Sequence, residues 1–114
     1  MPLINTLMET AKADTDLLYK LDSQGDDFGV ARDVDFLLRA RDRAQAEIAC
    51  DFINEHQYGV ATTQETGGEF SVLVVVHTPI QQQIICSISG FMACVCELFG
   101  LDYDGWGCVV SQRT

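Results

Sequence analysis

The stretch FSVLVVV, residues Phe70–Val76, forms the middle of the predicted sheet. Valine, leucine and phenylalanine dominate it, so apolar side chains stand on both faces of a strand that runs to His77. A strand of this kind is central, with both faces largely covered. A second strand is predicted at Tyr58–Thr63. Between the two strands, Gly67-Gly68 can adopt the positive φ angles that a hairpin turn needs.

Two helices and one strand are predicted before this hairpin. Pro2–Leu21 has the apolar spacing of an amphipathic helix, and Gly25 is a left-handed stop in the turn that follows it. Ala31–Ala40 alternates as a strand does. Arg41–Gln57 collects its apolar side chains on one side of a helix, which we expect to lie on an apolar surface.

A long helix and a short strand are predicted after the hairpin. Thr78 is a candidate helix cap, and the proline that follows it suits a first helical turn. From Ile80 to Phe99, nine large apolar residues fall on one side of a helix, and Gly100 ends it. Gly90 lies outside that side, where a close neighbouring element would explain it. The last strand is expected at Trp106–Ser111.

The order of these elements predicts an α+β fold. After the first helix, the βαββαβ order matches the ferredoxin-like arrangement, an antiparallel sheet with two helices on one face. Residues 1–27 then form an N-terminal helix and turn, and residues 28–114 a ferredoxin-like domain, together one compact domain. The second sheet face also needs a cover. We favour the N-terminal helix for it over a second copy of the protein.

The charge balance limits the class of partner. Acidic residues outnumber basic ones by 17 to 7, which gives a formal net charge of -10. Affinity for a phosphate backbone comes mainly from Lys and Arg, so direct nucleic-acid binding is not expected. A basic partner is favoured, although this charge would also serve solubility alone.

The cysteines and the lack of a signal-peptide pattern lead us to expect a cytoplasmic protein. Five cysteines without regular spacing favour reduced thiols over a disulfide framework. The N-terminus lacks the pattern of a signal peptide, and Ile84–Phe99 is too short and too amphipathic to span a membrane. Cys94 and Cys96 point to opposite sides of their helix, so they cannot bind one metal ion together.

No group of residues has the pattern of an active site. His56 and His77 are typical of packed or capping histidines, and no cysteine stands in a nucleophile motif. The pair Asp26-Asp27, like the two aspartates near the C-terminus, is typical of solvated turn residues. We therefore expect no enzyme activity, no cofactor and no metal, and keep a small thiol enzyme as an outside alternative.

One motif near the C-terminus is more specific. Asp102-Tyr103-Asp104-Gly105-Trp106-Gly107 places the only tryptophan between two glycines and beside two carboxylates. It resembles the YDGWG motif of the regulator of ribonuclease activity B family, small acidic bacterial proteins that inhibit ribonuclease E. The resemblance extends over residues 14–112. Its weaker parts are Leu17-Leu18 to Leu21, Gly25-Asp26, Val34-Asp35-Phe36 and Tyr58-Gly59-Val60.

The resemblance implies a function. It implies a ferredoxin-like fold, a cytoplasmic location, no catalysis, and binding to the arginine-rich C-terminal scaffold of ribonuclease E, which would alter RNA decay. An acidic protein suits such a partner. Members of the family can carry a long acidic tail after the last strand, whereas this sequence ends at Thr114. Where that tail contributes to binding, we expect weaker or different binding here.

The residues of the motif have two interpretations. In the structural one, Gly105 and Gly107 serve backbone geometry, and Trp106 covers the end of the core. In the functional one, the rings of Trp106 and Tyr103 face arginines of the partner. Counter-charge for those arginines comes from three carboxylates, those of Glu97, Asp102 and Asp104.

A different class of function uses the second sheet face. There a ferredoxin-like module would bind a small molecule or form a homodimer, near Arg39, Leu73 and His77. The sequence leaves this alternative open beside regulation of ribonuclease E.

Overall fold

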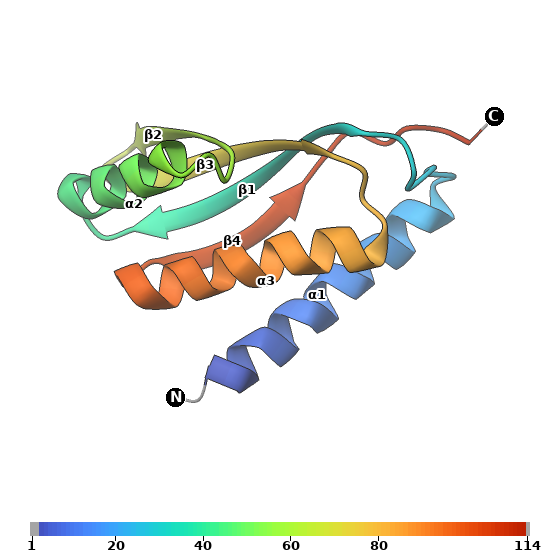
Figure 1. Ribbon diagram of the computed structural model, residues 1–114, viewed down its shortest axis with the longest axis horizontal. Helices are drawn as coiled ribbons and strands as arrows, with labels where there is room; N and C mark the ends of the chain where they lie inside the picture. The colour runs from blue at the N-terminus through green and yellow to red at the C-terminus, as the bar shows by residue number, and fades with distance from the viewer. Residues whose placement is uncertain (1–2, 114) are drawn as a thin grey trace.

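The computed structural model describes residues 3–113 of the 114-residue chain, so Pro2, the predicted start of the first helix, lies outside them. The element order predicted from the sequence is confirmed, and Figure 1 shows α3 lying between the sheet and α1. The elements are α1 (Leu3–Ser23), β1 (Arg32–Ala40), α2 (Arg43–Glu55), β2 (Val60–Thr66), β3 (Glu69–Thr78), α3 (Gln82–Phe99) and β4 (Asp102–Gly107).

The four strands form one open antiparallel sheet in the order β2-β3-β1-β4. The longest pairing joins β1 to β3, from Arg32 opposite Thr78 to Ala40 opposite Phe70. The hairpin between β2 and β3 turns at Gly67 and Gly68, whose φ angles of 59° and 83° are those that the double glycine predicts. The fold is therefore α+β, with a central pair of strands.

The core lies between this sheet and two helices. Alternate side chains of β1 and β3 face α2 and α3 and are wholly buried: Val34, Phe36, Leu38, Val72 and Val74. Ile53 of α2 and Ile85 and Met92 of α3 are buried equally completely against them. Since each such side chain contributes roughly 1.5–3 kcal/mol on burial, this layer is the main source of stability.

Hydrogen bonds of one glutamine, Gln45, link the start of α2 to the end of α3. Asp42 accepts a hydrogen bond from the Gln45 backbone N–H at 2.8 Å and so caps α2. The Gln45 side-chain amide donates to the carbonyls of Phe99 and Gly100. Gly100 ends α3 at a left-handed φ of 73°, as predicted.

The predicted start of α3 is wrong. Thr78 belongs to β3, and its hydroxyl donates to the Pro79 carbonyl at 2.8 Å instead of capping a helix. The Ile80 N–H donates to the Phe28 carbonyl at 2.9 Å, which holds this segment against the loop before β1. The helix can begin only after this segment, at Gln82.

The predicted last strand is also displaced. It was expected at residues 106–111, whereas β4 spans Asp102–Gly107, the glycine-rich motif itself. The register with β1 shifts between Phe36 and Leu38, and Gly105 has a φ of 89° that a residue with a side chain rarely adopts. The bulge allows β4 to stay paired with β1 although its aspartates and glycines have low strand propensity.

The position predicted for the first helix is contradicted. α1 packs along α3 instead of covering the second sheet face, with Leu18 and Leu21 in the core. Gly90 of α3 faces Leu7 of α1, so the neighbour expected near this glycine is present. Consequently the second face of β3 is not covered, and Leu73 there is only half-buried.

By length and composition alone, α3 could cross a membrane, with a mean hydropathy of 1.4 over its 18 residues. Core helices of soluble proteins meet the same criterion. Here α3 buries Ile85, Met92 and Val95 against the sheet and α1. Leu98, counted in its predicted apolar side, is 82% exposed.

Candidate partner-binding surface

β4 divides the predicted site residues between the two faces of the sheet. Tyr103 and Trp106 stand opposite Leu38 and Phe36, which are buried under the helices. Asp102 stands opposite Arg39, on the uncovered face. Because successive side chains of a strand alternate, the aromatic and acidic halves of the motif serve different surfaces.

The aromatic half belongs to a buried polar junction with α1 and α3. The Trp106 indole N–H donates to Asp14 Oδ1 at 3.0 Å, and the Ser89 hydroxyl donates to the same oxygen at 2.8 Å. The Tyr103 hydroxyl lies 2.7 Å from Ser89 Oγ. The polar atoms of both aromatic residues are therefore bound inside the protein, where they join β4 to two helices.

Asp14 at the centre of this junction was not singled out from the sequence. It is only 3% exposed, and burial raises its pKa, while hydrogen bonds from Ser89 and Trp106 partly oppose that rise. Within residues 3–113, its Oδ2 has no hydrogen-bond partner. The available signal was its place between Ala11 and Leu18 on the apolar side of α1.

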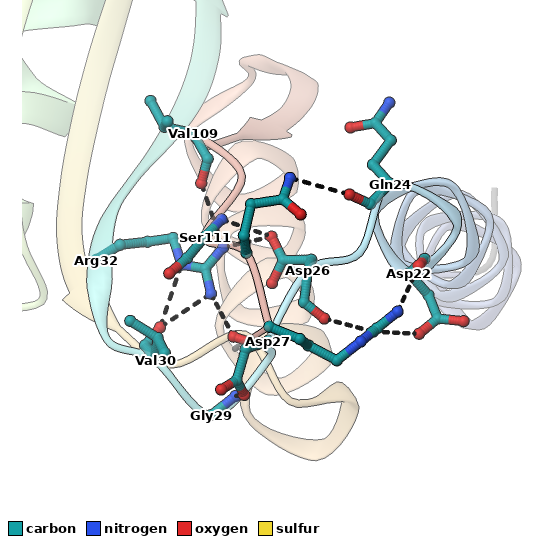
Figure 2. A network of polar contacts seen from close by, with 11 residues as sticks. Asp22, Gln24, Asp26, Asp27, Gly29, Val30, Arg32, Val109 and Ser111 are labelled. Atoms are coloured by element: carbon teal, nitrogen blue, oxygen red, sulfur yellow. Dashed lines mark hydrogen bonds and ion pairs between the residues drawn. The ribbon is translucent and has the colours of Figure 1, made fainter.

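A second buried carboxylate anchors the C-terminal segment, as Figure 2 shows. Asp26 was expected to be a solvated turn residue, but it is 1% exposed and its Oδ2 lies 2.6 Å from Arg32 Nη1. The same oxygen accepts from the Ser111 N–H at 3.2 Å, and Arg32 Nη1 donates to the Val109 carbonyl at 3.2 Å. The hydrogen bond with Asp26 raises the pKa of Arg32. This turn is a structural anchor.

The acidic half of the motif lies on the uncovered face. Asp104 Oδ2 is 3.1 Å from Arg39 Nη2, in an ion pair that is about half exposed. On the same face, Asp33 Oδ1 lies 2.9 Å from His77 Nδ1. Asp35 and Asp102 are exposed and form no ion pair with any other residue that the structure describes.

Glu97 is separated from these carboxylates. It lies on α3, where the Thr6 hydroxyl of α1 donates to it at 3.3 Å. The structure therefore brings Asp102 and Asp104 together near Arg39 and places Glu97 on the helical side of the sheet.

Comparison with known protein families shows to which family the chain belongs. A model of the family described as regulator of ribonuclease activity B matches residues 11–108. The chain belongs to this family. A search of curated proteins finds no match. The resemblance seen in the YDGWG motif is thus confirmed, and it extends over α1 from residue 11, including Asp14.

Membership of the regulator of ribonuclease activity B family fixes the broad function. The family regulates ribonuclease activity, which implies a ribonuclease as partner and a regulator rather than a catalyst. The motif that identifies the family is also the strand that carries the buried junction on one face and the two acidic residues on the other.

Four of the five thiols of this family member are poorly suited to nucleophilic chemistry. Burial raises the pKa of Cys50, Cys86 and Cys108, and raises that of Cys96 to about 12. A protonated thiol is a weak nucleophile and a weak metal ligand. Among residues 3–113, no three His, Cys, Asp or Glu side chains are grouped so that they could hold a metal ion.

Proposed function

We propose that this protein binds the basic C-terminal region of ribonuclease E and thereby modulates RNA decay, without catalysing a reaction itself. The observation that carries the proposal is the family match over residues 11–108, because a regulator must contact its enzyme or the assembly around it. We also propose that the protein is located in the cytoplasm, where ribonuclease E acts on RNA.

We further propose that the fold is ferredoxin-like. The βαββαβ order of the elements and the β2-β3-β1-β4 order of the sheet support this classification.

The electrostatics of the chain favour a basic partner. Of 17 acidic residues, five form ion pairs with Lys or Arg in the described part of the chain, and a sixth, Asp33, contacts His77. The remaining carboxylates produce a negative field that attracts arginine-rich segments and speeds their encounter. Carboxylates bind guanidinium groups through paired hydrogen bonds, so arginine is the best match in chemical terms.

A pull-down from a bacterial extract tests this proposal. The tagged full-length chain should retain ribonuclease E at low salt and lose much of it at about 0.5 M NaCl, because ions screen contacts between opposite surface charges. A variant of ribonuclease E without its basic C-terminal region serves as the control and should not be retained. Absence of binding at low salt, or equal retention of the truncated enzyme, would contradict the proposal.

A second candidate function has one observation in its favour. A recess of about 410 Å³ opens on the uncovered sheet face, where Leu37, Arg39 and Asp102 contribute to its lining. A small molecule or a second copy of the chain would bind there. A thermal-shift screen of metabolites and gel filtration over a range of concentrations test these two occupants. Neither a ligand-induced shift nor a dimer is expected if the face serves the ribonuclease.

A further inference from the structure

The uncovered sheet face has an apolar centre. We call the outward surface of β2, β3, β1 and β4 the open face; its apolar side chains are those of Val60, Leu73, Val75 and Leu37. Leu37 stands opposite Leu73, and Val75 stands opposite Val60, which is 68% exposed. These side chains form one continuous strip across three strands. Since the helices pack on the other side of the sheet, the strip is left to solvent.

Carboxylates border this strip. Asp33 and Asp35 lie at one end of β1, and Asp102 and Asp104 lie along β4. Arg39 on the open face is already paired with Asp104, and Arg41, just after β1, lines the same recess as Asp102. Asp33 is paired with His77. Asp35 and Asp102 form no ion pair among residues 3–113, and four carboxylates face two guanidinium groups around the apolar strip, a combination that fits a basic segment with interspersed apolar residues.

The shape of the open face gives access to both of these carboxylates. The recess of about 410 Å³ is lined by Leu37 and Asp102, and also by Arg39 and Arg41. Asp35 stands opposite Gly107, and no atom lies within 4 Å of the position that a Cβ would take there. A guanidinium group can therefore approach Asp35 beside Gly107, and the recess gives it room to reach Asp102 next to Arg39 and Arg41.

We propose that the open face is the docking surface for a basic segment of the ribonuclease partner. The segment places an apolar side chain on the strip around Leu37 and Leu73, and arginines at Asp35 and Asp102. This rests on the function proposed above and assigns it to one face of the sheet. A second copy of the chain would bring carboxylates against carboxylates, and nucleic acid would bring phosphates against them, so both fit the open face less well.

Matched charge variants of the full-length chain test this assignment. The double substitution Asp35→Asn, Asp102→Asn removes two charges from the open face. The control Glu47→Gln, Glu55→Gln removes two charges from α2 on the other side of the sheet, where both residues are exposed and outside the ion pairs. We expect the first variant to bind purified ribonuclease E at least about tenfold more weakly than wild type, because two charge-assisted contacts are lost. The α2 variant should stay within about twofold of wild type.

A third variant tests the apolar strip separately. Leu73→Gln should weaken binding but leave the dependence of log Kd on log salt concentration unchanged, because no charge is lost. The Asp35→Asn, Asp102→Asn variant should flatten that dependence. Circular dichroism checks that each variant is folded, which is expected because all the altered side chains point outward from the core.

The outcomes separate the docking assignment from the broader proposal. If wild type binds ribonuclease E and the open-face variants bind equally well, the assignment is overturned while the proposed function stands. Equal losses in the open-face and α2 variants also overturn it, because net charge alone would then explain binding. A wild-type dimer that Leu73→Gln dissociates assigns the face to a second copy instead. If wild type does not bind ribonuclease E at all, both proposals fail.

Discussion

Asp14 and Asp26 are the two buried carboxylates of this protein, and they differ in how their charge is compensated. Asp26 lies 2.6 Å from the Arg32 guanidinium and also accepts a backbone hydrogen bond from Ser111. Asp14 receives hydrogen bonds from Ser89 and Trp106, but no cation pairs with it among residues 3–113. Arg32 therefore compensates the charge of Asp26. No cation compensates Asp14 among residues 3–113, so the stability of the fold depends on whether Asp14 is protonated.

Stability should depend on pH through Asp14. Burial raises its pKa above the ordinary value of 3.8, so the folded state binds this proton more tightly than the unfolded state does. The resulting stabilisation is complete below pH 3.8 and is lost as the pH rises through the pKa of the folded state. The variant Asp14→Asn does not titrate at this position. Its free energy of unfolding minus that of wild type should therefore become more positive from about pH 4 to about pH 7.

Urea denaturation of both proteins across this pH range measures the difference. Taking the difference cancels the contributions of the other carboxylates, which both proteins share. A difference that stays constant or falls with pH would show that Asp14 is not held in a desolvated site.

The ion pair between Asp26 and Arg32 should be worth far more than an exposed pair of similar length. Arg32→Gln leaves a buried carboxylate without its cation, which we expect to lower the free energy of unfolding by about 3–5 kcal/mol. Arg43 and Glu65 form the comparison, at 2.7 Å with side chains 66% and 46% exposed. Arg43→Gln should cost about 0–1 kcal/mol. Chemical denaturation measures both, and equal losses would contradict the structural role assigned to Asp26.

Among the secondary-structure elements, α1 and β4 depend most on their neighbours. β4 contains two aspartates and two glycines, residue types of low strand propensity, and is held by its pairing with β1. α1 contributes Leu18 and Leu21 to the core and approaches α3 closely at Gly90. α1 is thus the neighbour expected beside Gly90, although the contact leaves room for a methyl group.

The packing of α1 on α3 should tolerate a methyl group at Gly90. A Cβ there would meet Leu7 Cδ2 at 3.7 Å, an ordinary contact distance. Since alanine favours a helix interior by about 1 kcal/mol over glycine, Gly90→Ala should raise the free energy of unfolding by about 0.5–1 kcal/mol.

Gly59 provides the contrasting substitution. A Cβ there would lie 2.7 Å from Val74 Cγ1 and 3.1 Å from the Val75 carbonyl oxygen, so the chain must shift. Gly59→Ala should therefore destabilise the protein by about 1–3 kcal/mol. Thermal and urea unfolding of the two variants give the comparison, and a destabilised Gly90→Ala would show that α1 packs more tightly than described.

For the molecule as a whole, the net charge of -10 acts on folding and on binding in opposite ways. Carboxylates repel one another in the compact state, so salt that screens this repulsion stabilises the fold. The same salt weakens the attraction of a basic partner.

The melting temperature should therefore rise as NaCl increases from about 0.01 M to about 0.15 M. Differential scanning calorimetry of the isolated chain measures it. A further scan at about 0.5 M NaCl checks that the partner loss expected at that salt concentration is not caused by unfolding. A falling melting temperature would mean that the exposed ion pairs outweigh the repulsion between carboxylates.

Local sequence was sufficient to place most elements of this protein. The valine-rich stretch at Phe70–Val76, the turn at Gly67-Gly68 and the stop at Gly100 each depend on the residues beside them, and all three are observed. The motif at Asp102–Gly107 likewise carries a resemblance to the family whose model matches residues 11–108. These features are encoded within a few residues, where propensity and turn chemistry act.

Contacts between distant residues settled what local sequence left open. Ser89 and Asp14 are 75 positions apart, and Asp26 meets Ser111 across 85 positions, so no local pattern identifies the partners of these aspartates. The apolar side of α1 showed that the helix needs a partner, but periodicity cannot name that partner, which is α3 rather than the sheet. Because α1 packs there, the open face remains uncovered, with Asp35 and Asp102 exposed on it.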